Sequence, residues 1–205
     1  MFFTLSRTGI ILLITAFGIQ LIINDNKKNK FLTLFIFIIA SLTLLFLSDQ
    51  IVTILKTIIP SIKQGTDTIG LRYDIWQGGW RMWMDNIIFG VGIGRFPEKI
   101  AFYAPGMHYS YITAHNTYLN MLAETGIVGF LLFMLLLIFT LKNFLEKRKT
   151  EDNLSDSLQN LWLSVFLVIL ISSLTMTVEY HKLLWFLIGI SVYFHKQANI
   201  ITHKK

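Results

Sequence analysis

The stretch AHNTYLNMLAETGIVGFLLFMLLLIFTL, residues 114–141, begins with polar side chains and continues as an almost unbroken apolar run. A helix that crosses a membrane needs about 20 largely apolar residues, and this stretch is long enough. On a helix, Asn116, Asn120 and Glu124 recur at every fourth position and therefore share one face. The stretch predicts a membrane-spanning helix that has a polar stripe on its outer turns and His115 at its outer end.

The composition of the whole chain also indicates an integral membrane protein. The chain has 205 residues, of which 54% are hydrophobic and 15% are charged, whereas a soluble domain carries about 25% charged residues. It has no cysteine, which excludes disulfides and thiolate metal sites. The net charge of +6 is typical of a membrane protein with positive inner loops, so we do not predict a nucleic-acid partner.

Four further apolar runs lead us to predict an all-α integral membrane protein with about five transmembrane helices and a long external, partly helical loop. The predicted spans are residues 8–23, 31–47, 115–141, 161–178 and 183–194. We treat residues 1–205 as a single membrane domain and residues 48–114 as its external loop region. Because the first span would start outside without a signal sequence, we expect the chain to be the C-terminal part of a larger polytopic protein.

Lysine and arginine set the predicted orientation. They cluster in residues 24–30, in residues 142–160 and in the C-terminal tail. These three segments fall on one side of the membrane if all five spans exist, and the positive-inside rule makes that side cytoplasmic. The external loop, Arg7 and His115 are then on the outer side.

The external region has the pattern of a helix at the membrane surface. In GLRYDIWQGGWRMWMDNIIFG, residues 70–90, one arginine and three tryptophans recur at helical spacing: Arg72, Trp76, Trp80 and Trp83. Either Asp67 or Thr68 could cap this helix, and its tryptophans suit the lipid headgroups. We expect FGVGIGRFPEKI, residues 89–100, to break the helix at its glycines and to stop at Pro97. No strand precedes these glycines, which argues against a nucleotide-binding loop.

The residue types alone leave two interpretations of the polar groups open. In the first, Glu124 and His115 line an external cavity. In the second, Glu124 only pairs with a basic residue and His115 is an interfacial side chain. Each outer arginine is more typically a headgroup anchor, but several that converge with a histidine would form a site for a diphosphate. His108 and His115 lie seven positions apart without a partner at ligand spacing, so we predict no metal and no cofactor.

The chain contains SRTG at residues 6–9, an R…W pattern that starts at Arg72, FGVGIGRF at 89–96 and AHNTYLNMLAETGIVG at 114–129, in this order. Together these motifs resemble the O-antigen ligase and polymerase superfamily, which are membrane glycosyltransferases that use polyprenyl-diphosphate-linked glycans. The resemblance covers about residues 5–139 in the family's order. One departure is Ile87, where family members often have proline, and another is the smaller number of spans.

The resemblance implies a metal-independent, GT-C-like transferase that acts at the outer face of the bacterial cytoplasmic membrane. It implies that Arg7 and Arg72 bind the diphosphate of an undecaprenyl-diphosphate-linked glycan and that His115 is the catalytic residue. Asn116 and Glu124 are then supporting residues that orient the imidazole or the sugar. The acceptor is a glycan, a lipid A core or a protein, and the sequence does not separate these.

Two alternatives need no such chemistry: a membrane transporter or channel component, and an inactive truncated remnant of a transferase. Transporters tend to place ionisable groups near the midplane of several spans. In this chain the polar groups gather at one outer end instead, which favours surface chemistry over transport.

Overall fold

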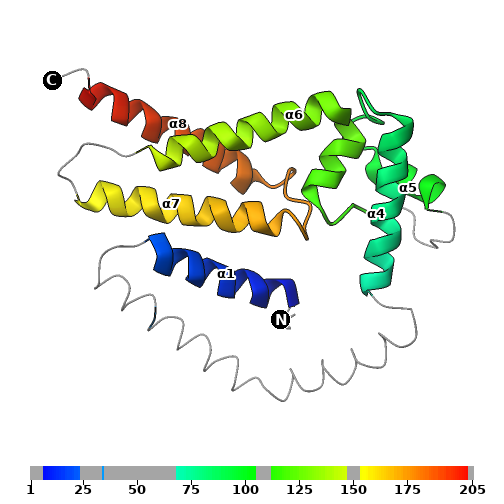
Figure 1. Ribbon diagram of the computed structural model, residues 1–205, viewed down its shortest axis with the longest axis horizontal. Helices are drawn as coiled ribbons and strands as arrows, with labels where there is room; N and C mark the ends of the chain where they lie inside the picture. The colour runs from blue at the N-terminus through cyan, green and yellow to red at the C-terminus, as the bar shows by residue number, and fades with distance from the viewer. Residues whose placement is uncertain (1–6, 24–33, 35–67, 105–111, 147–152, 203–205) are drawn as a thin grey trace, which may run out of the picture.

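The computed structural model describes residues 7–23, 34, 68–104, 112–146 and 153–202 (Figure 1). The second predicted span, residues 31–47, and the loop up to residue 67 lie almost wholly outside these ranges. Within the described residues every regular element is a helix and no strand occurs. The predicted all-α class is therefore confirmed for this part of the chain.

Six helices are described. In chain order they are α1 (Arg7–Ile23), α4 (Thr68–Asp85), α5 (Phe96–Tyr103), α6 (Thr117–Leu145), α7 (Asn153–Ser172) and α8 (Lys182–Thr202). Among the described helices, α6 is the one both long and apolar enough to cross a membrane, and α7 contains a shorter apolar stretch, Ser157–Ser172.

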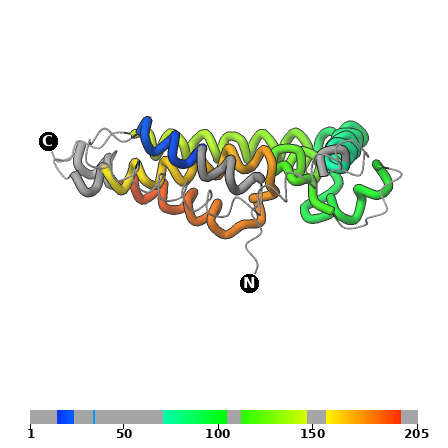
Figure 2. The backbone as a smooth tube through the Cα atoms, turned by 90° about the horizontal axis from the view of Figure 1, so that it is seen from below, coloured from blue at the N-terminus to red at the C-terminus, as the bar shows by residue number. Residues whose placement is uncertain are grey.

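The long helices α1, α6, α7 and α8 form an elongated bundle, with α4 and α5 at one end of it (Figures 1 and 2). The first residues of α1, α6 and α8 and the last residues of α7 lie at that same end (Figure 1). The opposite end carries the last residues of α1, α6 and α8.

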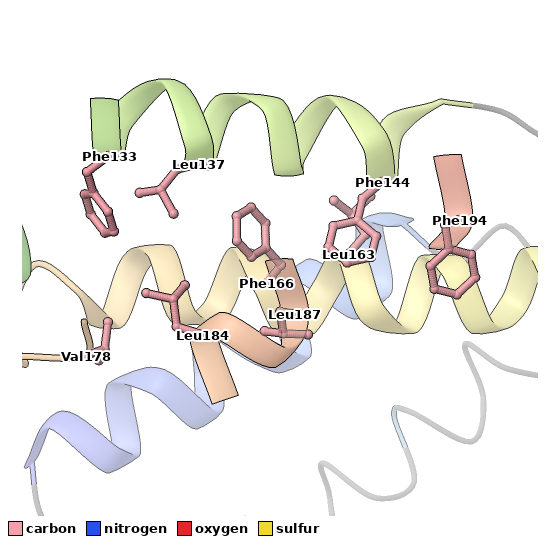
Figure 3. Close-up of a cluster of buried hydrophobic side chains, with 9 residues drawn as sticks. All are labelled: Phe133, Leu137, Phe144, Leu163, Phe166, Val178, Leu184, Leu187 and Phe194. Carbon is pink, nitrogen blue, oxygen red and sulfur yellow. The ribbon is translucent and has the colours of Figure 1, made fainter. Parts of the chain in front are cut away.

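Two apolar clusters hold these parts together. The larger one lies between α6, α7 and α8 (Figure 3), and its buried members are Phe133, Leu137, Phe144, Leu163, Phe166, Val178, Leu184, Leu187 and Phe194. The smaller one joins α4 and α5 to the start of α6, through Ile75, Met82, Phe96, Ile100, Ala104, Ala114 and Ala123. Outside the larger cluster, α6 exposes leucines such as Leu131, Leu132 and Leu135, which suits a helix face in contact with lipid chains.

A sharp bend divides α6 into two segments (Figure 1). At the bend Gly126 has φ 65° and ψ −170°, a conformation that only glycine adopts readily. The bend separates two backbone pairs that a continuous helix would join, Ile127 N–H with Ala123 C=O and Val128 N–H with Glu124 C=O. The predicted third span is therefore helical on both sides of Gly126 but not continuous through it.

The segment between α4 and α5 supplies the missing backbone partners. The N–H groups of Val91 and Gly92 donate to the carbonyl oxygens of Ala123 and Glu124, at 3.0 and 2.8 Å. In return, Ile127 N–H donates to the carbonyl of Ile87 at 2.8 Å, and Val128 N–H donates to that of Ile88 at 3.4 Å. The family departure at Ile87 therefore falls on a residue whose carbonyl is used here.

This close approach of two backbones requires glycine on both sides. Gly126 faces the carbonyl of Ile88, and Gly90, which has φ 66°, faces the carbonyl of Glu124. A side-chain Cβ at either position would overlap the opposing backbone. The helix that the glycines were predicted to break, α4, already ends at Asp85. The glycines at residues 90–94 lie in the turn after it, and this turn fills the break in α6.

Three other boundaries differ from the sequence predictions. Pro97 does not stop a helix but lies in the first turn of α5, where its missing N–H costs nothing. The fourth predicted span reached Val178, whereas α7 ends at Ser172 and residues 173–181 form a turn. The last helix, α8, is longer than the predicted residues 183–194 because its polar end, near Lys196, continues the helix.

Replacing Gly126 with alanine should destabilise the folded protein. Alanine adds backbone strain of about 1–3 kcal/mol at this conformation and a Cβ that overlaps the Ile88 carbonyl. We expect a lower Tm for the detergent-solubilised Gly126→Ala protein. The matched control is Gly189→Ala in α8, where no atom lies within 4 Å of the added Cβ. Equal Tm values for the two variants would contradict the described backbone contact.

Candidate active site

His115 stands directly before α6 and has an unusual backbone conformation. Its φ is 48°, the left-handed region, and it is the one non-glycine residue with positive φ within the described ranges. This conformation costs roughly 1–2 kcal/mol for an ordinary residue, so the surrounding structure must hold it. Its side chain is exposed to solvent. An exposed imidazole on a strained backbone is a common feature of functional sites.

Asn116 is the N-cap of α6. Its side-chain oxygen accepts a hydrogen bond from the N–H of Leu119 at 3.1 Å, and its backbone is extended. The helix therefore starts at Thr117, one residue later than the predicted polar stripe assumed. The Asn116 amide serves the helix start, and no described hydrogen bond joins it to the His115 imidazole.

The residues on both sides of the His-Asn pair are fixed by other parts of the fold. The indole N–H of Trp76, on α4, donates to the carbonyl of Ala114 at 2.9 Å. Thr117 is fully buried, and its N–H donates to the carbonyls of Ser173 and Met176 in the α7–α8 turn, at 2.8 and 3.1 Å. His115 therefore lies on a short bridge between α4 and this turn.

Arg72 acts electrostatically on His115. Arg72 lies in the second turn of α4, four residues before Trp76. Although His115 is exposed, partial burial of the imidazole lowers its pKa from the ordinary 6.5, and the positive charge of Arg72 lowers this pKa further. Both effects disfavour the imidazolium, so the histidine stays neutral and able to accept a proton at neutral pH.

Arg7 is the first residue of α1, and the structure describes its backbone but not its side chain. The start of α1 lies at the same end of the bundle as the start of α6 (Figure 1). The helix that carries Arg7 packs along α7, whose last residues lead into the turn that holds Thr117. Arg7, as the first residue of α1, is thus at the end of the bundle where α6 starts.

Glu124 is buried and has a full set of partners away from His115. Its two carboxylate oxygens accept hydrogen bonds from the N–H groups of Gly94 and Phe96, at 2.9 and 3.0 Å. The hydroxyl of Tyr180 donates a third hydrogen bond to the carboxylate. Glu124 therefore holds the start of α5 and the α7–α8 turn against α6, and no described bond joins it to His115.

The sequence interpretation missed the α7–α8 turn, residues 173–181, as a part of this region. Tyr180 bonds to Glu124, and burial together with that bond and the nearby carboxylates raises the pKa of Tyr180, so the phenol keeps its proton. Glu179 is 5% exposed, and burial raises its pKa. The sequence did contain a signal for this turn, which is Glu179 itself. A glutamate between two apolar runs rarely lacks a partner inside the protein.

An aromatic hollow lies on α4. It measures about 400 Å³ and is lined by Tyr73, Trp76, Gln77, Trp80 and Arg81. Trp76 thus serves both the hollow and the backbone next to His115. Within the described residues, no group of three or more His, Asp or Glu side chains is arranged so that it could hold a metal ion.

The chain was compared with models of known protein families. A family model described as O-antigen ligase matches residues 1–134. The matched part includes α1, α4, α5 and the first half of α6, and with them Arg7, Arg72 and His115. A search of curated proteins finds no match for this chain.

Removing the charge of Arg72 should raise the pKa of His115. We expect an NMR titration of the purified protein, with labelled histidine, to give His115 a pKa below 6.5. In Arg72→Gln this pKa should rise but stay below 6.5, because burial is the larger cause of the shift. The control is Arg81→Gln, since Arg81 bonds to the carbonyl of Tyr103 instead. An unchanged His115 titration in Arg72→Gln would show that the two side chains do not interact.

Proposed function

The chain belongs to the O-antigen ligase family, and from this we propose that it transfers a glycan from a polyprenyl-diphosphate carrier to an acceptor hydroxyl. The observation that supports this proposal best is the hydrogen bond from Trp76 to the carbonyl of Ala114, because it joins the helix that carries Arg72 to the residue before His115. Members of this family are bacterial membrane proteins with a ligase role, and the donor, the acceptor and the residue roles are our proposals.

We propose that Arg72 and Arg7 hold the diphosphate of the donor. A guanidinium is always charged and forms two parallel hydrogen bonds to phosphate oxygens. The polyprenyl diphosphate is a good leaving group, so it needs charge stabilisation more than a proton, and fixed cations supply this stabilisation in the transition state. In this proposal the reaction needs no metal, and the apolar lining of the hollow on α4 suits the prenyl chain.

His115 is the general base of the proposed reaction. Its neutral imidazole takes the proton of the acceptor hydroxyl while the oxygen attacks the anomeric carbon and the bond to the diphosphate breaks. The products are the glycosylated acceptor, the polyprenyl diphosphate and an imidazolium that returns its proton to water. Direct displacement of this kind inverts the anomeric configuration.

Arg72 has two effects in this mechanism, and they occur at different times. In the free enzyme its charge adds to the effect of burial, and both lower the pKa of His115 and so favour the neutral imidazole. When the diphosphate binds, its negative charge offsets that of Arg72 and makes the imidazole a stronger base. Binding of the donor therefore prepares the base before the acceptor reacts, which limits proton uptake by the empty site.

We propose that Asn116 and Glu124 support the site through the backbone. Asn116 caps α6 and so sets where the helix starts, directly after His115. Glu124 holds α5 and the α7–α8 turn against the same helical segment. The acceptor is a glycan on its own carrier, a lipid A core or a protein, and each of these offers the hydroxyl group that this mechanism uses.

We propose that the site faces the outer side of the bacterial cytoplasmic membrane. The last residues of α1 and α6 lie at the end of the bundle opposite the start of α6. In the sequence, lysine-rich segments follow both helices, and such segments stay in the cytoplasm. A cysteine introduced at Gln64 should therefore react with an impermeant thiol reagent in intact cells, and one at Asn153, at the start of α7, should not. The reverse pattern would place His115 in the cytoplasm and remove the outer-face proposal.

Removal of the imidazole should abolish transfer without loss of donor binding. Loss of a general base typically lowers the rate by about 10² to 10⁴-fold, so both His115→Ala and His115→Asn should lose visible glycan transfer. Asparagine adopts the left-handed backbone more readily than most residues, so it tests the base separately from the backbone. Transfer by the unmodified protein should also decline at a pH below 6.5, where His115 becomes protonated.

The same assay includes His181→Ala as a control and two variants of Arg72 as tests of donor binding. His181 is exposed in the α7–α8 turn, and its alanine variant should keep normal transfer. Arg72→Ala should lose donor binding, and Arg72→Lys should restore it only in part, because lysine keeps the charge but not the planar fork. Normal transfer by His115→Asn would refute the base, and normal donor binding by Arg72→Ala would refute the diphosphate contact.

A further inference from the structure

Glu179 is a buried carboxyl group in the α7–α8 turn that the proposed reaction does not use. Its side chain is 5% exposed, and neither carboxyl oxygen has a hydrogen bond of normal geometry to another described residue. Its own backbone carbonyl is held by the indole N–H of Trp185 at 2.7 Å. A buried carboxyl group without a strong donor is costly, so its position needs a reason.

The turn places this carboxyl group against the first turn of α6. The hydroxyl of Thr117 donates to the carbonyl of Met176 at 2.9 Å and accepts from the N–H of Val178 at 2.8 Å. Glu179 follows Val178 directly. The side chains of Thr117 and Asn120 favour its charged form, although burial and the nearby Glu124 carboxylate raise its pKa overall. Thr117 and Asn120 are therefore its immediate polar neighbours.

The buried side chain of Asn120 has a hydrogen-bond donor without a partner. Its side chain is 1% exposed, and its Oδ1 faces the N–H of Ala114 at 3.5 Å, while its Nδ2 has no described partner. A carboxamide has a donor end and an acceptor end, and only one of its two orientations offers oxygen to Ala114. An oxygen acceptor on the Nδ2 side stabilises that orientation, and the Glu179 carboxyl group, which also lacks a partner, lies near the Asn120 side chain.

We propose that Glu179 is a positioning residue for His115. Its carboxyl group accepts from Nδ2 of Asn120 and so keeps Oδ1 of Asn120 turned toward the N–H of Ala114. Ala114 is thereby held at both its N–H, by Asn120, and its carbonyl, by Trp76. These two contacts fix the backbone immediately before His115, whose left-handed conformation sets the direction of the imidazole.

This inference rests on the proposed function only in the role given to His115. The contacts of Ala114 and the orientation of Asn120 do not depend on which reaction the protein catalyses. An NMR signal of His115 therefore reports on the positioning, and the rate of glycan transfer reports on its consequence. The two readouts separate a failure of this inference from a failure of the base mechanism.

The test exchanges the two partners. Asn120→Asp removes the amide donor and places a second carboxyl group beside Glu179, and it should lower the transfer rate about tenfold or more. The double variant Asn120→Asp/Glu179→Gln again has one carboxyl and one amide, with the acceptor still next to Ala114. We expect it to recover most of the rate and the His115 resonance position, with donor binding unchanged throughout.

The matched control is Asn120→Asp/Glu179→Ala, which removes the same carboxyl group but supplies no donor. It should stay as slow as Asn120→Asp. Protein level and Tm identify any variant that fails to fold, and the exchanged pair keeps both the volume and the charge of the original. If the exchanged pair is as slow as the alanine control, Glu179 does not orient Asn120 and the inference is refuted. If it recovers the His115 signal while His115→Asn remains active, the positioning holds and the base mechanism fails.

Discussion

The break in α6 at Gly126 is the constraint on which this structure depends. A helix that crosses a lipid bilayer must satisfy all of its backbone hydrogen bonds inside the protein, because no water is present to do so. The break frees two N–H groups and two carbonyl groups, and residues 87, 88, 91 and 92 pair with those same four groups. The connection between α4 and α5 is therefore an integral part of α6, and it cannot move away without leaving unpaired backbone in an apolar region.

The break also explains how a strained histidine can be held. The short segment between Asn116 and Gly126 is fixed at its far end by this connection and by the contacts of Glu124. At its near end it is fixed by Trp76 and by the α7–α8 turn. Left-handed backbone at a non-glycine residue persists only where the surroundings over-determine it, and both ends of this segment meet that condition.

The electrostatic effect of Arg72 on His115 depends on the same arrangement. The two residues lie 43 positions apart (115 − 72), and α4 comes close to the start of α6 because the smaller apolar cluster and Trp76 join them. A cation beside an imidazole makes proton uptake less favourable. The charge of Arg72 therefore favours the neutral form of His115. In the proposed reaction the anionic donor offsets the charge of Arg72 when it binds.

The sequence by itself determined the membrane class, the Trp-rich helix and the polar start of the third span, because composition and helical spacing record which faces are apolar. The motifs that contain Arg7, Arg72 and His115 also indicated the family and the candidate residues. Only the tertiary structure decided the break at Gly126, since an interrupted span has the same apolar pattern as a continuous one. It alone assigned the partners of Glu124, which lie 28, 30 and 56 positions away, and the place of Glu179. A buried polar group takes its partner from whichever distant segment packs against it, and sequence spacing does not record that choice.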